Sequence, residues 1–278
     1  MTVLPFVPAP DQQAHVFRKA LPLQVRLQEV MRALGAKEGL MGLEFGSDNG
    51  VYSKQLRKRG GTWQTVVWRE DAADSIGQVL GEKVQRYSDG GLPFEKKLFD
   101  VVVVTDFLER FVDDVAFIEE CHKVLKPDGR LVVGVHRIGT WRPVDVLRQL
   151  LGLTYQKQGF VRPGYTESEL FGVLKSGFDV HVVRAYSRFF VELTDAIVAR
   201  AVERLSTGAE DSGRRLARLY TIAGIFYRLA FQLDLVLFFS RGYRFMAVAK
   251  RRAWRPRNAP VLVDGRSITE AVLSRAPA

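Results

Sequence analysis

The residues of this sequence best suited to chemistry lie in a glycine-containing segment, residues 42–50, which includes Glu44, Gly46, Asp48 and Gly50. An apolar run predicts a strand directly before it, and a helical pattern follows it. In a doubly wound sheet such a turn lies at the carboxyl edge, where ligands bind against backbone amides and a helix amino terminus. No P-loop lysine follows, and carboxylates here would repel a phosphate, so the segment favours a ligand that carries positive charge.

This segment belongs to a longer alternation of strand and helix patterns. We expect strands over residues 40–45, 64–68, 84–87, 100–105, 129–136, 179–184 and 243–249, and helices over residues 21–34, 51–59, 72–80, 112–124 and 144–153. Residues 101–104 are all valine, as in a central strand buried on both faces. The alternation predicts a parallel sheet with helices on both faces.

Four stretches in order resemble one known family. An acidic residue precedes G-x-D-x-G at residues 44–50, "LPF" at 92–94 leads to "FDVVV" at 99–103, "FLERF" stands at 107–111, and "VLKPDG" at 124–129. Over about residues 38–185 the chain resembles the class I S-adenosylmethionine-dependent methyltransferases of the type 11 kind. The resemblance implies a Rossmann-like, doubly wound, seven-stranded α/β sheet, with a helical insertion before the last strand.

The resemblance also implies S-adenosylmethionine as the cofactor, with its methionine part at the glycine turn. Gly46 and Gly50 would let the backbone approach it, and Glu44 would help hold its amino group. Asp48 replaces the middle glycine of the family's motif and adds a negative charge, which suits a sulfonium cation better than a phosphate.

Matching positions further along the chain would hold the rest of the cofactor. Glu70 or Asp71, after the second strand, would bind the ribose hydroxyls. Asp89 would accept a hydrogen bond from the adenine amine, and Thr105 or Asp106 would border the sulfonium.

His136 ends the fifth expected strand, on the edge where an acceptor would meet the methyl group, and is the candidate general base. A hydrogen-bonded structural histidine is the alternative. Methyl transfer can also proceed largely by positioning, without a dedicated base. One cysteine and four scattered histidines offer no spacing for a metal site.

The pattern divides the chain into five parts. We expect an extended lead-in and helix over 1–37, the methyltransferase core over 38–188, an apolar and amphipathic helical insertion over 189–240, the last core strand over 241–250 and a basic, loosely ordered tail over 251–278. Residues 219–239 are the most apolar stretch, but Arg228 and Asp234 interrupt it, so it is not assigned as a transmembrane span. It either packs on the core or lies on a membrane surface.

The amino-acid composition indicates which kinds of partner and which cellular compartment are favoured. The net charge of +10 favours anionic partners, among them acidic lipids, and basic residues gather after residue 240. The fourth strand ends in "TDFL" and lacks the Asn/Asp-Pro-Pro-Tyr signature, so a nucleic-acid substrate is disfavoured. Without a secretory signal pattern or a disulfide framework, we expect a cytoplasmic protein, in one reading peripheral on the inner face of the membrane.

Two functions follow. The first is a methyltransferase that acts on a small-molecule or lipid-like acceptor. The second is a non-catalytic, membrane-associated scaffold that retains the fold while Asp48 weakens the cofactor site. Binding of the cofactor distinguishes them.

Overall fold

The computed structural model describes residues 9–35, 39–45, 49–88, 91–139, 143–205 and 212–254. The predicted cofactor residues Gly46, Asp48 and Asp89 lie outside these ranges.

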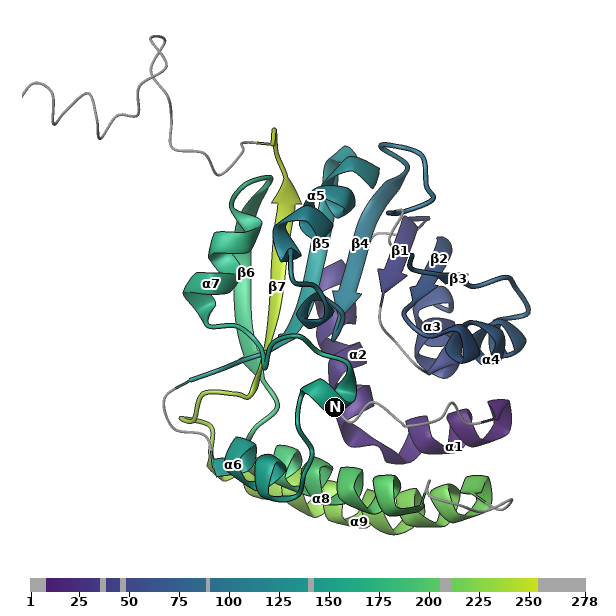
Figure 1. The fold of residues 1–278 in the computed structure, drawn as a ribbon, viewed down its shortest axis with the longest axis vertical. Helices are drawn as coiled ribbons and strands as arrows, with labels where there is room; N and C mark the ends of the chain where they lie inside the picture. Colours follow the sequence, from purple (N-terminus) through teal and green to yellow (C-terminus); the bar gives the residue numbers. More distant parts are fainter. Residues whose placement is uncertain are drawn as a thin grey trace, which may run out of the picture.

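A mixed sheet forms the centre of the molecule (Figure 1). Among the described residues its seven strands are β1(Met41–Phe45), β2(Thr62–Val67), β3(Gln85–Arg86), β4(Phe99–Thr105), β5(Leu125–His136), β6(Phe178–Tyr186) and β7(Arg244–Arg251), in the order β3-β2-β1-β4-β5-β7-β6. Strands β1 to β5 pair in parallel, and β7 runs antiparallel to both its neighbours. The predicted Rossmann-like fold class is confirmed.

Helices cover both faces of this sheet because its central strand is apolar on both sides. Val101 and Val103 of β4 face α2(Leu21–Leu34) and α3(Gly50–Arg57), while Val102 and Val104 face α5(Asp114–Val124) and α7(Glu167–Leu174). The helix α4(Glu70–Leu80) packs on α3 and β2. The short helix η1(Leu108–Arg110) follows β4. The unbroken valine run is thus a strand buried on two faces, as its pattern indicates.

The inserted helices form a layer below the carboxyl ends of the parallel strands (Figure 1). This layer contains α8(Phe189–Leu205) and α9(Ser212–Val236) from the insertion and α6(Pro143–Leu150) from the core. The short helix η2(Gln156–Gln158) follows α6 in the chain. The helix α9 packs along α8 and also along α1(Pro10–Lys19). Parallel α/β sheets bind ligands at this edge, so the layer of helices covers the place where a site is expected.

Two sequence expectations are wrong in detail. Residues 10–19 were expected to be extended, but they form α1, because Pro10 suits the first turn of a helix and Val16 and Phe17 are buried under α9 and α2. The tail was expected to be loose from residue 251, but β7 includes Arg251, and Trp254 packs on His122 with ring centroids 5.2 Å apart. Residues 255–278 lie outside the described chain.

Candidate functional site

Glu44 lies on β1, one residue before the strand ends, and its side chain is buried. Its Oε1 accepts a hydrogen bond of 2.8 Å from Thr65, and Arg57 lies 3.5 Å away. Burial raises the pKa of Glu44, and Ser53, Thr65 and Arg57 offset only part of that effect. Within the described part of the chain, Oε2 is buried without a hydrogen-bond partner. A buried acceptor that lacks a donor at this edge suits a cationic group of a ligand.

Gly50 begins α3, and the structure gives it a packing role. Its N–H donates to Oε1 of Gln13 on α1 over 2.7 Å. A Cβ at this position would come 2.9 Å from the Cβ of Val79 on α4. The glycine therefore permits α3 and α4 to approach closely, and α1 covers the amino terminus of α3.

We expect Gly50→Ala to lower the free energy of unfolding by about 1–3 kcal/mol, because the new methyl group must push α4 aside. Urea titration of both proteins measures the change. Gly224→Ala in α9 is the control, because the nearest neighbour of its new methyl group, at 3.1 Å, is the flexible side chain of Lys19. A Gly50→Ala protein as stable as the parent would contradict the packing role.

Glu70 and Asp71, the alternatives for the ribose hydroxyls, lie in the first turn of α4 at the carboxyl edge of β2. Glu70 is 81% exposed, with Arg86 3.5 Å away. Asp71 is held by Arg69, whose Nε donates to it over 2.9 Å, and this hydrogen bond lowers the pKa of Asp71. Both carboxylates face solvent more than the interior.

Sequence reasoning missed an aromatic cluster that lies beside these acids. Trp68, directly after β2, stacks on Tyr87, directly after β3, with an interplanar angle of 13° and centroids 6.0 Å apart. Phe107 and Phe111 meet both rings edge-on. The available signal was an aromatic residue directly after β2 and β3 and another two positions after β4, because the carboxyl ends of parallel strands share one edge. The partly exposed rings of Trp68 and Tyr87 suit a planar heterocycle.

Thr105 and Asp106, expected near the sulfonium, are both buried at the end of β4. The Thr105 hydroxyl donates to the carbonyl of Phe45 over 3.3 Å, tying β4 to β1. Asp106 has a positive φ of 52°, and two arginines bind its carboxylate: Arg26 at 2.5 Å and Arg244 at 2.8 Å. Its charge is thus already neutralised by the protein, so Asp106 organises the site more than it attracts a cation.

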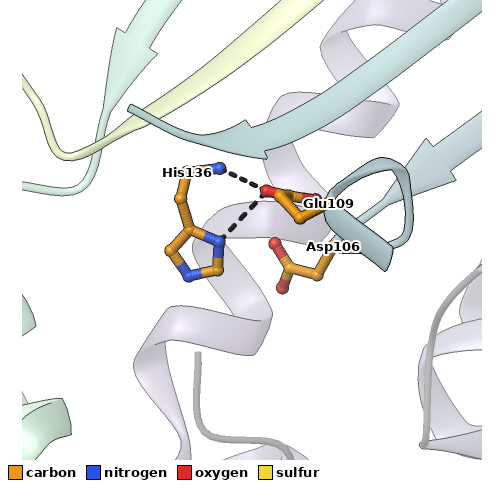
Figure 2. Close-up of side chains that lie close together, drawn as sticks. All are labelled: Asp106, Glu109 and His136. Carbon is orange, nitrogen blue, oxygen red and sulfur yellow. Dashed lines mark hydrogen bonds and ion pairs between the residues drawn. The ribbon is translucent and has the colours of Figure 1, made fainter. Parts of the chain in front are cut away.

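His136 ends β5 and faces Glu109 of η1 (Figure 2). Oε1 of Glu109 accepts hydrogen bonds from the His136 backbone N–H, 2.7 Å away, and from Nδ1, 3.1 Å away. Nε2 lies 3.0 Å from Arg244. Because arginine only donates, that contact makes Nε2 the acceptor and leaves the ring proton on Nδ1. Burial alone lowers the pKa of His136, but the Glu109 hydrogen bond and the charges of Asp106 and Glu109 outweigh it and raise the pKa.

Asp106, Glu109 and His136 also form a cluster whose ligand atoms lie within 4.8 Å of one another (Figure 2). The surroundings do not fit a metal ion. Two guanidinium groups contact Asp106 and one of them also contacts His136, so a further cation would meet strong repulsion.

A cavity of about 390 Å³ opens beside His136. It lies between the end of β5, the helices α6 and α8, and residues 153–163. Its polar wall includes Asp145, Arg148, Gln149, Tyr155 and Glu192, and its apolar wall includes Ile138, Leu153, Phe160 and Pro163. The cavity has the size and mixed lining of a small-molecule site.

Buried ion pairs fix the inserted helices to the sheet around this cavity. Arg244 of β7 contacts Glu192 of α8 at 3.0 Å as well as Asp106. Arg148 of α6 contacts Glu192 at 2.8 Å and Asp195 at 3.3 Å. Tyr227 of α9 donates to Asp195 over 3.0 Å. We call this chain of contacts the buried ion network; it consists of Arg26, Asp106, Arg244, Glu192, Arg148 and Asp195.

Comparison with known proteins agrees with the motifs. Residues 43–133 match the family model of the methyltransferase domain. No curated protein sequence matches the chain.

Solved structures share the fold at low identity. A protein from Bacillus halodurans named as a candidate methyltransferase is 14% identical over 82% of this chain and all of that one, with a TM-score of 0.56. One from Galdieria sulphuraria, named as a candidate sarcosine dimethylglycine methyltransferase, is 13% identical over 85% of this chain and 86% of that one, with a TM-score of 0.54. The [4+2]-cyclase SpnF is 14% identical over 91% and 99%, with a TM-score of 0.52.

Residues 43–133 thus match a methyltransferase domain, and the sheet has the order predicted for the fold of the class I S-adenosylmethionine-dependent methyltransferases. The resemblance predicted from the sequence is confirmed for residues 43–133, and the enzyme class and the cofactor are those that a methyltransferase domain implies. The similarity to SpnF means that the fold accommodates more than one kind of reaction, so the acceptor must be argued from the site.

Proposed function

We propose that this protein transfers a methyl group from S-adenosylmethionine to a small-molecule or lipid-like acceptor bound in the cavity beside His136. The observation that carries the proposal is the position of this cavity. It opens at the carboxyl edge of β5, under the inserted helices, and His136 lies in its wall.

The residues present at the neighbouring strand ends fit the cofactor. Oε2 of Glu44 offers a buried acceptor for the ammonium group of the methionine part. Trp68 and Tyr87 offer aromatic faces for the adenine, and Glu70 or Asp71 would bind the ribose hydroxyls from the solvent side. The cofactor supplies an electrophilic methyl group on a sulfonium when it is bound.

The role of His136 is to accept a proton. An electron pair of the acceptor, either a lone pair on oxygen or nitrogen or the π pair of a carbon nucleophile, forms the bond to the methyl group as the bond between that methyl group and sulfur breaks. The displaced proton passes to Nε2 of His136, which must first exchange its hydrogen bond from Arg244 for one from the acceptor. Glu109 then faces the imidazolium through Nδ1, and its negative charge stabilises that form. Glu109 is a positioning residue, because it acts through the histidine.

The lining of the cavity supports an amphiphilic acceptor. Arg148 and Glu192 would bind polar groups at one wall, while Leu153 and Phe160 contact an apolar part. A lipid-like molecule with a polar head that carries the nucleophile has both features.

A pH profile tests the pairing of His136 with Glu109. We expect kcat/KM to rise with pH through a midpoint above 6.5, because only the neutral imidazole accepts the proton. In Glu109→Gln the imidazolium loses a stabilising charge, so the midpoint moves to lower pH by about one unit. A purely structural glutamate would change the maximum rate and leave the midpoint in place.

The scaffold hypothesis makes the opposite prediction for the cofactor. A protein that only retains the fold would bind neither S-adenosylmethionine nor S-adenosylhomocysteine. Radiolabelled methyl transfer, with acceptor extracts fractionated into lipid and water-soluble pools, tests the activity itself. Label in either pool supports the enzyme, and the pool that takes it identifies the acceptor class.

A further inference from the structure

The outward surface of α9 is unusually apolar, although no other described element covers that surface. Its inward face consists of Leu216, Tyr220, Ala223, Tyr227, Ala230 and Asp234, all buried against α8 and α1. The opposite surface exposes Ile222, Ile225, Phe226, Leu229, Leu233 and Val236. We call this second set the α9 face.

Residues of the α9 face follow helical spacing. Positions 222, 226, 229, 233 and 236 are separated by steps of four and three, which places them along one side of the helix. The turn that follows the helix exposes Phe238 and Phe239 as well. At 25 residues α9 is about 37 Å long, so the apolar stripe is long and nearly straight.

By length and composition, Gly213–Val236 is one helix of the described chain that could cross a membrane. Its contacts in this structure favour a helix that lies along the surface of the protein and does not cross the membrane. Asp234 accepts hydrogen bonds from the backbone N–H groups of Phe190 and Val191 at the start of α8, at 2.8 and 3.0 Å. Tyr227 also donates a hydrogen bond to Asp195. The helix therefore lies lengthwise against the protein, and only its outer side can contact a membrane.

All the exposed charged side chains described on α9 are arginines. Arg218 and Arg228 are exposed on α9, and Arg241 is exposed shortly after it. The acidic residue within α9, Asp234, is buried. Exposed arginines beside an apolar stripe, with no exposed acid on the helix, complement an anionic lipid surface.

The same charges disfavour a second copy of the chain as the occupant. A two-fold contact through α9 would bring the arginines of both copies together, and α9 offers no exposed carboxylate to pair with them.

We propose that α9 is an interfacial membrane-binding helix, with the α9 face buried among the acyl chains of an anionic leaflet and its arginines at the phosphates. The protein is then peripheral on a cytoplasmic, anionic membrane surface.

This placement brings the candidate site close to the lipid. The helix α6 packs on α8, lines the cavity through Asp145 and Arg148, and exposes Val146 and Leu150 one turn apart. These helices lie in one layer (Figure 1). An acceptor drawn from the leaflet would reach the cavity over α6. This last step rests on the proposed function, whereas membrane binding itself does not.

Vesicle flotation of the full chain tests the proposal without any need for activity. We expect the protein to float with phosphatidylcholine vesicles that contain phosphatidylglycerol, and much less with phosphatidylcholine alone at the same ionic strength. Phe226→Ser combined with Leu229→Ser should reduce partitioning about tenfold or more, because two large apolar side chains no longer enter the bilayer. Arg218→Gln combined with Arg228→Gln should reduce it about fivefold or more, on the anionic vesicles only.

A matched control is Phe171→Ser. Phe171 is 51% exposed on α7, against 57% for Phe226, but α7 packs on the other face of the sheet. This variant should float like the parent protein. Equal flotation of the parent and the Phe226/Leu229 variant would overturn the proposal. So would a dimer in sedimentation velocity that the same two substitutions dissociate, because α9 would then be a protein interface.

Discussion

Replacing Arg244 with methionine is expected to lower the free energy of unfolding by about 3–5 kcal/mol, the largest loss of stability that we predict for a single substitution. Arg244 is 3% exposed and contacts three groups: Asp106, Glu192 and His136. Without it, two buried carboxylates lose a positive partner in a region that excludes water. The free energy of unfolding from urea titration measures the loss.

Lys250→Met provides the control on the same strand. Lys250 is 48% exposed and pairs with the exposed Asp128 at 2.9 Å. Its substitution should change the stability by about 0.5 kcal/mol or less, because water screens such a pair. If both variants lost equal stability, the buried ion network would not hold the inserted helices to the sheet.

The largest effect on the reaction is expected for His136→Asn. If His136 takes the proton during methyl transfer, its loss should lower kcat by about 10²–10⁴-fold. Binding of S-adenosylhomocysteine should stay within about twofold, because His136 lies in the cavity and not at the end of β1 or β2. Single-turnover transfer of labelled methyl to the identified acceptor measures the rate.

His181→Asn is the matched control for that substitution. His181 is exposed on β6, away from the cavity, so its variant should transfer methyl groups like the parent protein. A His136→Asn enzyme with the parent's kcat would contradict the assignment of a base and favour catalysis by positioning alone.

The sequence predicted those parts of the fold that depend on local patterns. The valine run at residues 101–104 predicted the central strand. The capping box of Thr166 and Glu169 is a second local signal: the Thr166 hydroxyl accepts from the Glu169 N–H, and the Glu169 carboxylate accepts from the Thr166 N–H. Both signals depend on neighbours a few positions apart, so one sequence is sufficient to recognise them.

The organisation of the site could not be predicted in the same way. Arg26 and Asp106 are 80 positions apart, and Arg244 and Asp106 are 138 apart. Nothing local marks these charges as partners, because ordinary surface arginines and aspartates look the same in a sequence. The expectation that Asp106 borders the sulfonium therefore overlooked the two arginines that bind it. His136 and the strand ends could be placed, since topology alone brings them to one edge.

The helix α1 shows a second limit of sequence reasoning. It is mostly polar and contains few apolar residues, and the prolines near its start suggested extended chain. The helix gains its stability from burial of Val16 and Phe17 in the layer made with α9, which begins about two hundred residues later. Tertiary packing of this kind outweighs a weak local preference.

Every step proposed for the enzyme depends on binding of S-adenosylmethionine at the carboxyl edge of this sheet. The decisive measurement is isothermal titration of the purified full chain with S-adenosylmethionine and with S-adenosylhomocysteine. We expect saturable binding of both, with one molecule per chain. Absence of binding by a protein that circular dichroism and thermal melting show to be folded would contradict the methyltransferase mechanism, and the membrane-binding helix would then remain as the basis of function.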